Sequence, residues 1–138
     1  MIAYIDSSVL LRFVLDQPDP LTEILGFDDR ITSVIAEVEC LRAVDTARLR
    51  GELDDDQYVE RRSSVFMQMR RLRRIMPSRS VLQRAGEPLP SPLKTLDAIH
   101  VATALQWRDR KAPDLVFATH DRRQAMVAGS LGFDVIGV

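Results

Sequence analysis

The chain has 138 residues, 46% of them hydrophobic and 28% charged, with 19 basic and 20 acidic side chains and a formal net charge of −1. These values predict one globular domain spanning residues 1–138, and its single cysteine, Cys40, excludes an internal disulfide and fits a reducing compartment. Because no apolar run approaches membrane-spanning length and the start from Met1 to Asp6 lacks a signal-peptide pattern, we expect a cytoplasmic protein rather than a membrane protein.

The first predicted element is a short buried strand over Ile2–Ile5, followed by a helix that runs to Val14 with Ser7 or Ser8 as its cap. Asp6 therefore stands where a strand ends. Ligands of parallel α/β sheets bind in the crevice beyond the strand ends, so this acid is a candidate for chemistry. A role as a turn or capping residue explains it equally well.

The next segment predicts a short helix over Leu21–Leu25, a second strand over Arg30–Ser33 and a long helix over Val34–Arg50. The long helix carries two acids, Glu37 and Glu39. Because this helix is apolar over a wide arc, periodicity alone does not choose which of the two faces the interior.

Eight arginines and no acid occur between residues 61 and 84. A helix that starts at the acidic run 54–56 should bury a stripe formed by Val65, Phe66, Met69 and Leu72. Arg70, Arg71 and Arg74 project away from this stripe and are candidates for binding RNA phosphates, since guanidinium groups suit phosphate oxygens. A solvated helix face is the more common meaning of such a run.

A brief strand at Ile75–Met76 should precede a short helix that Ser78 caps and that ends near Gly86. The proline-rich run 87–92 then forms a stiff loop that is too short for a domain linker.

The stretch from Thr95 to Leu105 predicts a helix that is buried on most sides, because residues 98–105 are nearly all small or apolar. Thr95 is its expected N-cap, which places Asp97 in the first turn. An acid there can simply complement the positive end of the helix.

The clearest strand is Leu115–Thr119, and Asp121 follows it almost at once. A helix through Ala125 and Ala128 and a last strand over Phe133–Val138 complete the chain. Strands that alternate with helices predict an α/β fold with a central parallel sheet of about five short strands flanked by helices.

Three acids, Asp6, Asp97 and Asp121, stand at the ends of predicted elements, and the helix over Val34–Arg50 adds a fourth, Glu39 (or Glu37). Together they would repel one another unless a cation intervened. Carboxylates without His or Cys favour hard ions such as Mg²⁺ or Mn²⁺, which can activate water for hydrolysis of a phosphodiester. The residue types therefore predict a metal-dependent nuclease.

Four motifs occur in the order found in PIN-domain ribonucleases, especially the VapC toxins of bacterial toxin-antitoxin pairs: Asp6–Ser8, Glu39–Ala43, Leu96–Ala104 and Thr119–Asp121. The chain resembles this family over nearly its whole length. The resemblance implies a PIN-like fold and an endoribonuclease toxin that cleaves single-stranded RNA. It also implies a cognate VapB-like antitoxin partner and a homodimer.

The resemblance also assigns roles to individual residues. It selects Glu39 rather than Glu37 as the fourth catalytic acid, and it makes Asp6, Asp97 and Asp121 the metal ligands. Ser8 and Thr119 match polar positions that support the carboxylates or metal-bound water, although capping explains both nearly as well. We read the two histidines, His100 and His120, as packing or hydrogen-bonding residues rather than as bases.

Two functions of other classes compete with this one. A catalytically idle PIN-like interaction domain has the same pattern if its acids do not act together. A phosphatase of the haloacid-dehalogenase type also begins with a strand-end Asp, but its second acid two residues later is replaced here by Ser8.

Overall fold

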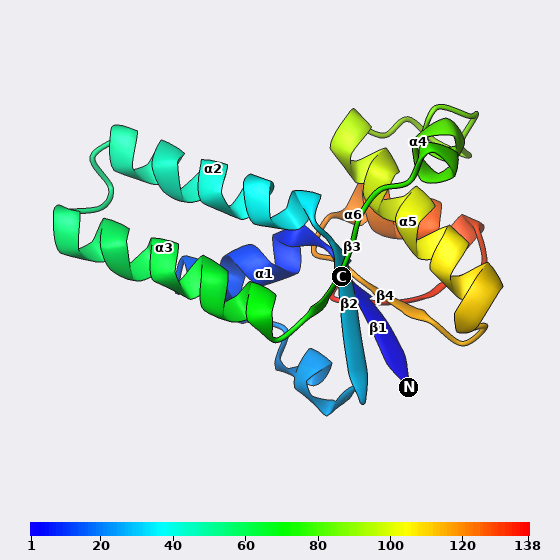
Figure 1. Ribbon diagram of the computed structural model, residues 1–138, viewed down its shortest axis with the longest axis horizontal. Helices are drawn as coiled ribbons and strands as arrows, with labels where there is room; N and C mark the ends of the chain where they lie inside the picture. Colours follow the sequence, from blue (N-terminus) through cyan, green and yellow to red (C-terminus); the bar gives the residue numbers. More distant parts are fainter.

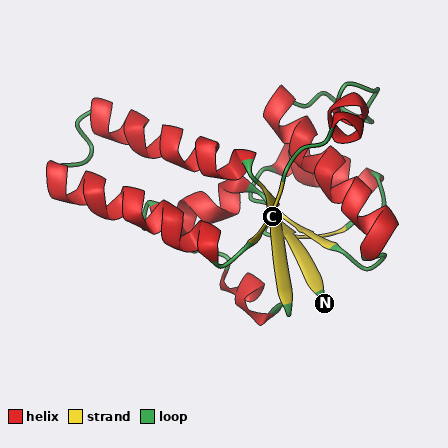
Figure 2. Ribbon diagram, viewed as in Figure 1, coloured by secondary structure: helices red, strands yellow, loops and turns green.

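The computed structural model describes residues 1–138 and has a five-stranded sheet between two groups of helices (Figures 1 and 2). The strands are β1 (Ile2–Ile5), β2 (Asp29–Ser33), β3 (Arg73–Ile75), β4 (Val116–Ala118) and β5 (Asp134–Ile136). The helices are α1 (Ser7–Val14), α2 (Ile35–Leu49), α3 (Asp55–Arg70), α4 (Arg79–Ala85), α5 (Thr95–Lys111) and α6 (Arg122–Ser130), with a 3₁₀ turn, η1, at Thr22–Gly26.

All strand pairs are parallel, in the order β3-β2-β1-β4-β5. The central strand β1 is apolar because helices cover both of its faces, and Ala3, Tyr4 and Ile5 are fully buried. The prediction of a parallel sheet of about five short strands is confirmed. In such a sheet all strands end at one edge, which brings the residues that follow β1, β2 and β4 together.

The two groups of helices give the sheet two cores. Helices α1, α2 and α3 cover one face, where Val9, Val44 and Val65 are buried with Met69. Helices α4, α5 and α6 lie on the other side of the sheet (Figure 1). A stack of Tyr4 on Phe117 belongs to the core on this side, together with Val101 of α5 and Val127 of α6. No helix combines the length and apolar character needed to cross a bilayer.

Two helix caps differ from the sequence predictions. The N-cap of α1 is Asp6, whose side chain accepts a hydrogen bond from the Ser8 amide, rather than Ser7 or Ser8. The N-cap of α5 is Lys94, without a side-chain cap, so Thr95 is already the first helical residue. Asp97 remains in the first turn, as expected.

The short helix expected over Leu21–Leu25 is present as a 3₁₀ helix over Thr22–Gly26. The packing of one other segment differs from the predicted pattern. In α3, Val65 and Met69 are buried as predicted, but Phe66 is 38% exposed and lies beneath Arg62 instead of joining the core. Consecutive helical residues point about 100° apart, and here Val65 and Met69 take the inward positions while Phe66 lies at the margin of the buried face.

Candidate functional site

Four carboxylates meet beyond the carboxyl ends of the strands. Asp6 directly follows β1, Glu39 lies near the start of α2, Asp97 is in the first turn of α5, and Asp121 caps α6 after β4. Burial raises the pKa of Asp97, and the negative charges of Asp6, Asp121 and Glu39 raise it further. The fold therefore brings all four predicted acids within electrostatic reach of one another.

Asp6 is 2% exposed and is held by several donors. Its Oδ2 accepts hydrogen bonds from the Ser8 amide at 3.0 Å and the Ser8 hydroxyl at 2.6 Å, while Oδ1 accepts one from Gln124 Nε2 at 3.1 Å. The Thr119 hydroxyl donates to Gln124 Oε1 at 2.7 Å. Ser8 and Thr119 thus stand beside the acidic cluster, where the motifs predict a supporting role for them.

Gln124 is a site residue that the sequence reasoning missed. It is fully buried, and its backbone amide donates to Asp121 Oδ1 at 2.9 Å while its side chain reaches Asp6. One amide side chain therefore links the acids that follow β1 and β4. The available signal was the spacing Asp121-x-x-Gln124, which resembles a capping box, although here the Gln side chain turns inward.

Glu39 is tied to a buried histidine. Its Oε1 lies 2.5 Å from His100 Nε2, and its Oε2 accepts a hydrogen bond from the Ser7 hydroxyl at 3.1 Å. His100 is itself 0% exposed and bonds through Nδ1 to the Tyr4 hydroxyl at 2.7 Å. These contacts support the choice of Glu39 over Glu37, which makes no side-chain hydrogen bond.

Asp97 and Asp121 form the open part of the cluster. The Asp97 carboxylate accepts no hydrogen bond and forms no ion pair, and Asp121 uses one oxygen as the cap of α6. Both line a hollow of about 400 Å³ whose other walls are Lys94, Arg122 and Arg123. Free carboxylate oxygens therefore border a small hollow that is lined only by charged residues.

These donors fit a hard cation of the Mg²⁺ type. No three His, Cys, Asp or Glu side chains are placed to enclose an ion, but Mg²⁺ usually keeps several waters and binds through one or two carboxylates plus substrate phosphate. The two incompletely used carboxylates, Asp97 and Asp121, match that requirement. Asp6 and Glu39 stand behind them with their oxygens already hydrogen-bonded.

The predicted RNA-binding arginines lie elsewhere. Arg70 and Arg71 come just before β3, at the sheet edge where strands begin, and Arg74 lies in β3 itself. The neighbouring Arg73 forms an ion pair at 2.9 Å with Asp29, the first residue of β2, which shows that this segment lies where the strands begin. All three predicted arginines are exposed, but none lines the hollow of Asp97 and Asp121.

The His120 ring bonds to the chain terminus and makes no hydrogen bond with the acids. Its Nδ1 donates to the Gly137 carbonyl at 2.7 Å, and its amide donates to the Ser8 hydroxyl at 3.0 Å. His120 therefore ties the end of β4 to the chain terminus. Both histidines are hydrogen-bonding residues, as expected, but only His100 touches a carboxylate of the cluster.

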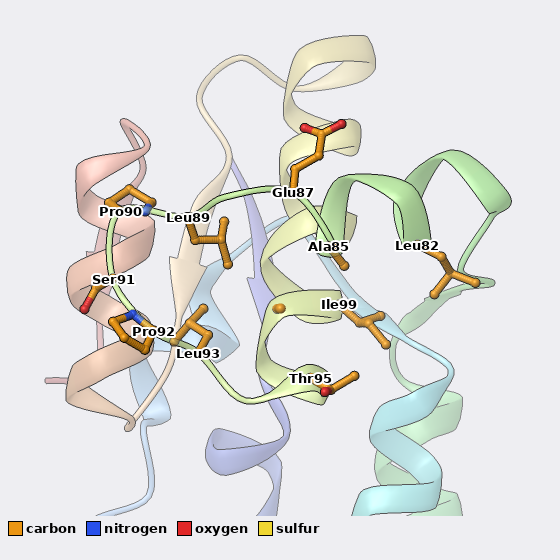
Figure 3. Close-up of a pocket in the computed structure, with 12 residues that line it drawn as sticks. Leu82, Ala85, Glu87, Leu89, Pro90, Ser91, Pro92, Leu93, Thr95 and Ile99 are labelled. Atoms are coloured by element: carbon orange, nitrogen blue, oxygen red, sulfur yellow. The ribbon is translucent and has the colours of Figure 1, made fainter.

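A second hollow, of about 600 Å³, lies between α4, α5 and the loop that joins them (Figure 3). Leu89 and Leu93 of the loop point towards α5, whereas Glu87 points outward. Glu87 is the only ionisable side chain in its lining. This hollow therefore lacks the groups for acid, base or metal chemistry.

Comparison with known proteins gives consistent matches. The PIN domain family model matches residues 3–130. Ribonuclease VapC46 of Mycobacterium tuberculosis (strain ATCC 25618 / H37Rv) is 33% identical over 141 residues, which cover 96% of this chain and 95% of that protein.

Three solved structures share the architecture. A toxin-antitoxin complex from Klebsiella pneumoniae has a TM-score of 0.65 at 18% identity and covers 97% of this chain and 95% of that one. VapBC2 from Rickettsia felis, bound to a promoter DNA fragment, gives 0.67 at 15% identity, with coverage of 99% and 98%. VapBC-1 from nontypeable Haemophilus influenzae gives 0.63 at 14%, with coverage of 99% and 97%. At these identities the likeness shows the fold.

Proposed function

The chain belongs to the PIN domain family, and on that premise we propose that it is a toxin of the VapC type, an endoribonuclease that hydrolyses phosphodiesters in single-stranded RNA and depends on Mg²⁺ or Mn²⁺. The observation that carries this proposal is the free Asp97 carboxylate, which has no hydrogen-bond or ion-pair partner and whose pKa is raised by burial first and then by the charges of Asp6, Asp121 and Glu39.

Two of the four acids are held in place by hydrogen bonds, and the other two keep free carboxylate oxygens. Asp6 and Glu39 are held by Ser8, Gln124, Ser7 and His100, so neither can turn away when the site fills. Asp97 and Asp121 would hold the cation with their free oxygens. When bound, such a cation supplies an activated water and stabilisation of the leaving oxygen.

Cleavage assays with purified protein test this function. We expect single-stranded RNA to be cut with Mg²⁺ or Mn²⁺, and cleavage to stop when EDTA is added and resume with excess metal. Asp97→Asn should abolish cleavage, whereas Asp114→Asn, an exposed acid before β4, should not. Full activity in EDTA would rule out the metal mechanism, and no cleavage under any condition would favour the idle interaction domain.

An antitoxin partner fits a second feature of the surface. An apolar hollow of about 430 Å³ opens beside Glu39 and is lined in part by Leu11, Val38 and Leu96. Val38 is 59% exposed and Leu96 is 46% exposed, although both are large and apolar. A VapB-like peptide that covers them would also close the approach to the acids.

Growth experiments test the partner and the cellular setting, which we propose is the cytoplasm. Expression of the chain alone should arrest bacterial growth, and co-expression of the small gene next to it should restore growth. Harmless expression of abundant folded protein would contradict the toxin function. Light scattering on the purified toxin should give the mass of a homodimer, as the family leads us to expect.

A further inference from the structure

Three cations line the hollow of Asp97 and Asp121 without pairing with its acids. Lys94 immediately precedes α5, and Arg122 and Arg123 open α6. All three are exposed, and none of their nitrogens lies within 4.0 Å of a carboxylate oxygen in an ion pair. We call these three side chains the basic rim.

The missing ion pairs matter because other basic side chains of this protein do pair with nearby acids. Arg42 and Arg48 both bind Asp45, and Arg84 binds Glu87. In the hollow of about 400 Å³, the basic rim and the two acids line the same walls but form no ion pair with one another. The guanidinium and ammonium donors of the basic rim are therefore available to another anion at no cost in broken ion pairs.

The acidic cluster itself creates the need for such cations. A polyanion that approaches four carboxylates is repelled, and the repulsion is strong because Asp6 and part of Asp97 are buried. Cations on the same walls reduce this repulsion where the phosphate must enter. Arg122 and Arg123 can each bind phosphate oxygens through two N–H groups, while Lys94 acts as a point charge.

We propose that Lys94, Arg122 and Arg123 bind the RNA phosphates that flank the scissile bond, and that Arg70, Arg71 and Arg74 do not bind substrate. This inference rests on the proposed ribonuclease function and deepens it by assigning the substrate-binding residues. It replaces the arginines that the sequence favoured because those precede or lie in β3, near the end of the sheet where strands begin.

Salt-dependent RNA binding tests the proposal. The probe is a labelled single-stranded RNA, and its affinity is measured by fluorescence anisotropy in EDTA, where the proposed metal-dependent cleavage does not occur. The rim variant Lys94→Ala/Arg122→Ala/Arg123→Ala is compared with a control of equal charge change, Arg70→Ala/Arg71→Ala/Arg74→Ala. A charge-preserving variant, Arg122→Lys/Arg123→Lys, shows whether charge alone suffices, and thermal melting shows that each variant folds.

Each lost phosphate contact should reduce the slope of log affinity against log salt by roughly 0.7, so the rim variant should lose about 2 units. Between about 50 and 200 mM salt, wild type should then weaken roughly 20-fold more than the rim variant. The control should parallel wild type, and the double lysine variant should keep the wild-type slope.

The outcomes separate this inference from the function on which it rests. If wild type cleaves and binds RNA but the rim variant has the wild-type slope, the basic rim has no substrate role and only the inference fails. If the slope falls equally in both triple variants, net charge rather than position governs binding, and this result also overturns the inference. If wild type neither cleaves nor binds the RNA, the proposed function fails first and the inference falls with it.

Discussion

His100 and Glu39 are 61 residues apart in the sequence, yet His100 Nε2 lies 2.5 Å from Glu39 Oε1 inside the protein. Burial by itself lowers the pKa of His100. The hydrogen bond with Glu39 and the charges of Asp6 and Glu39 outweigh burial, and the resulting pKa of His100 is raised. Contact with Glu39 and Asp6 thus favours the protonated imidazole more than an ordinary buried site would.

The first prediction concerns the Tyr4 hydroxyl, which holds the other nitrogen of His100 at 2.7 Å. Tyr4→Phe keeps the ring stack on Phe117 but leaves His100 Nδ1 buried without a partner. We expect a loss of about 1–3 kcal/mol in the free energy of unfolding, measured by urea denaturation. Tyr58→Phe, at a half-buried ring in α3, is the control and should cost less. Equal losses would mean that the Tyr4 hydroxyl contributes nothing specific.

The second prediction concerns the stability of the metal-free protein. Asp97→Asn removes a half-buried charge that faces Asp6, Asp121 and Glu39 while keeping nearly the same volume. The melting temperature in EDTA should therefore rise, although cleavage is lost. Asp114→Asn should leave the melting temperature nearly unchanged. A lower melting temperature for Asp97→Asn would instead mark Asp97 as a structural residue.

The raised pKa of Asp97 also predicts how the stability of the metal-free protein depends on pH. Because burial and then the neighbouring acids raise the pKa of Asp97, the folded state holds this proton at pH values where the unfolded chain has lost it. Stability therefore falls as pH rises from the unfolded pKa through the folded pKa. In melting curves from about pH 4 to 8, the advantage of Asp97→Asn should grow with pH and then level off. An advantage that is largest at the acid end would contradict this origin.

The sequence alone predicted the fold because its signals are local and repeated. Short apolar runs such as Ile2–Ile5 and Leu115–Thr119 alternate with helices, and parallel pairing follows from that alternation. The motifs identified the four acids, three of which lie at element ends. The sequence did not specify which side chains touch them, because contacts such as Gln124 to Asp6 join residues 118 positions apart through the tertiary fold.

The predicted RNA-binding residues show a second reason why the site could not be fully predicted from the sequence. Arg70, Arg71 and Arg74 were prominent because the charge is dense along the chain, but their position relative to the acids depends on the direction of β3 in the sheet. Lys94 is far from Arg122 and Arg123 in the sequence, and the three meet only because α5 and α6 begin at the same edge. Charge density in sequence therefore did not identify charge near the site.

The third prediction concerns Cys40, which lies next to Glu39 but packs in the core between α1, α2 and α3. Burial, followed by the charges of Glu39 and Asp6, raises the pKa of the Cys40 thiol to about 12. At pH 8 only about one molecule in 10,000 then carries the reactive thiolate. Native protein should resist iodoacetamide, and urea-unfolded protein should react within minutes. Rapid labelling of the native state would contradict a buried, inert thiol.

The last prediction links the chain terminus to the site through Gly137. This residue has φ +104°, and a Cβ added to it would lie 2.4 Å from the Thr119 carbonyl oxygen. Gly137 also accepts the hydrogen bond from His120. Gly137→Ala must therefore strain the backbone and push against Thr119, whose hydroxyl holds Gln124 beside Asp6.

We expect Gly137→Ala to cost at least about 2 kcal/mol of unfolding free energy and to lower RNA cleavage, because displacement of Thr119 reaches the carboxylates. The matched control is Gly129→Ala in α6, where nothing lies within 4 Å of the added Cβ. Replacing that helical glycine should stabilise the protein by about 0.5–1 kcal/mol and leave cleavage unchanged. Urea denaturation and single-turnover cleavage of both variants decide the matter. If Gly137→Ala is as stable and active as Gly129→Ala, the close approach between Gly137 and Thr119 does not constrain the site.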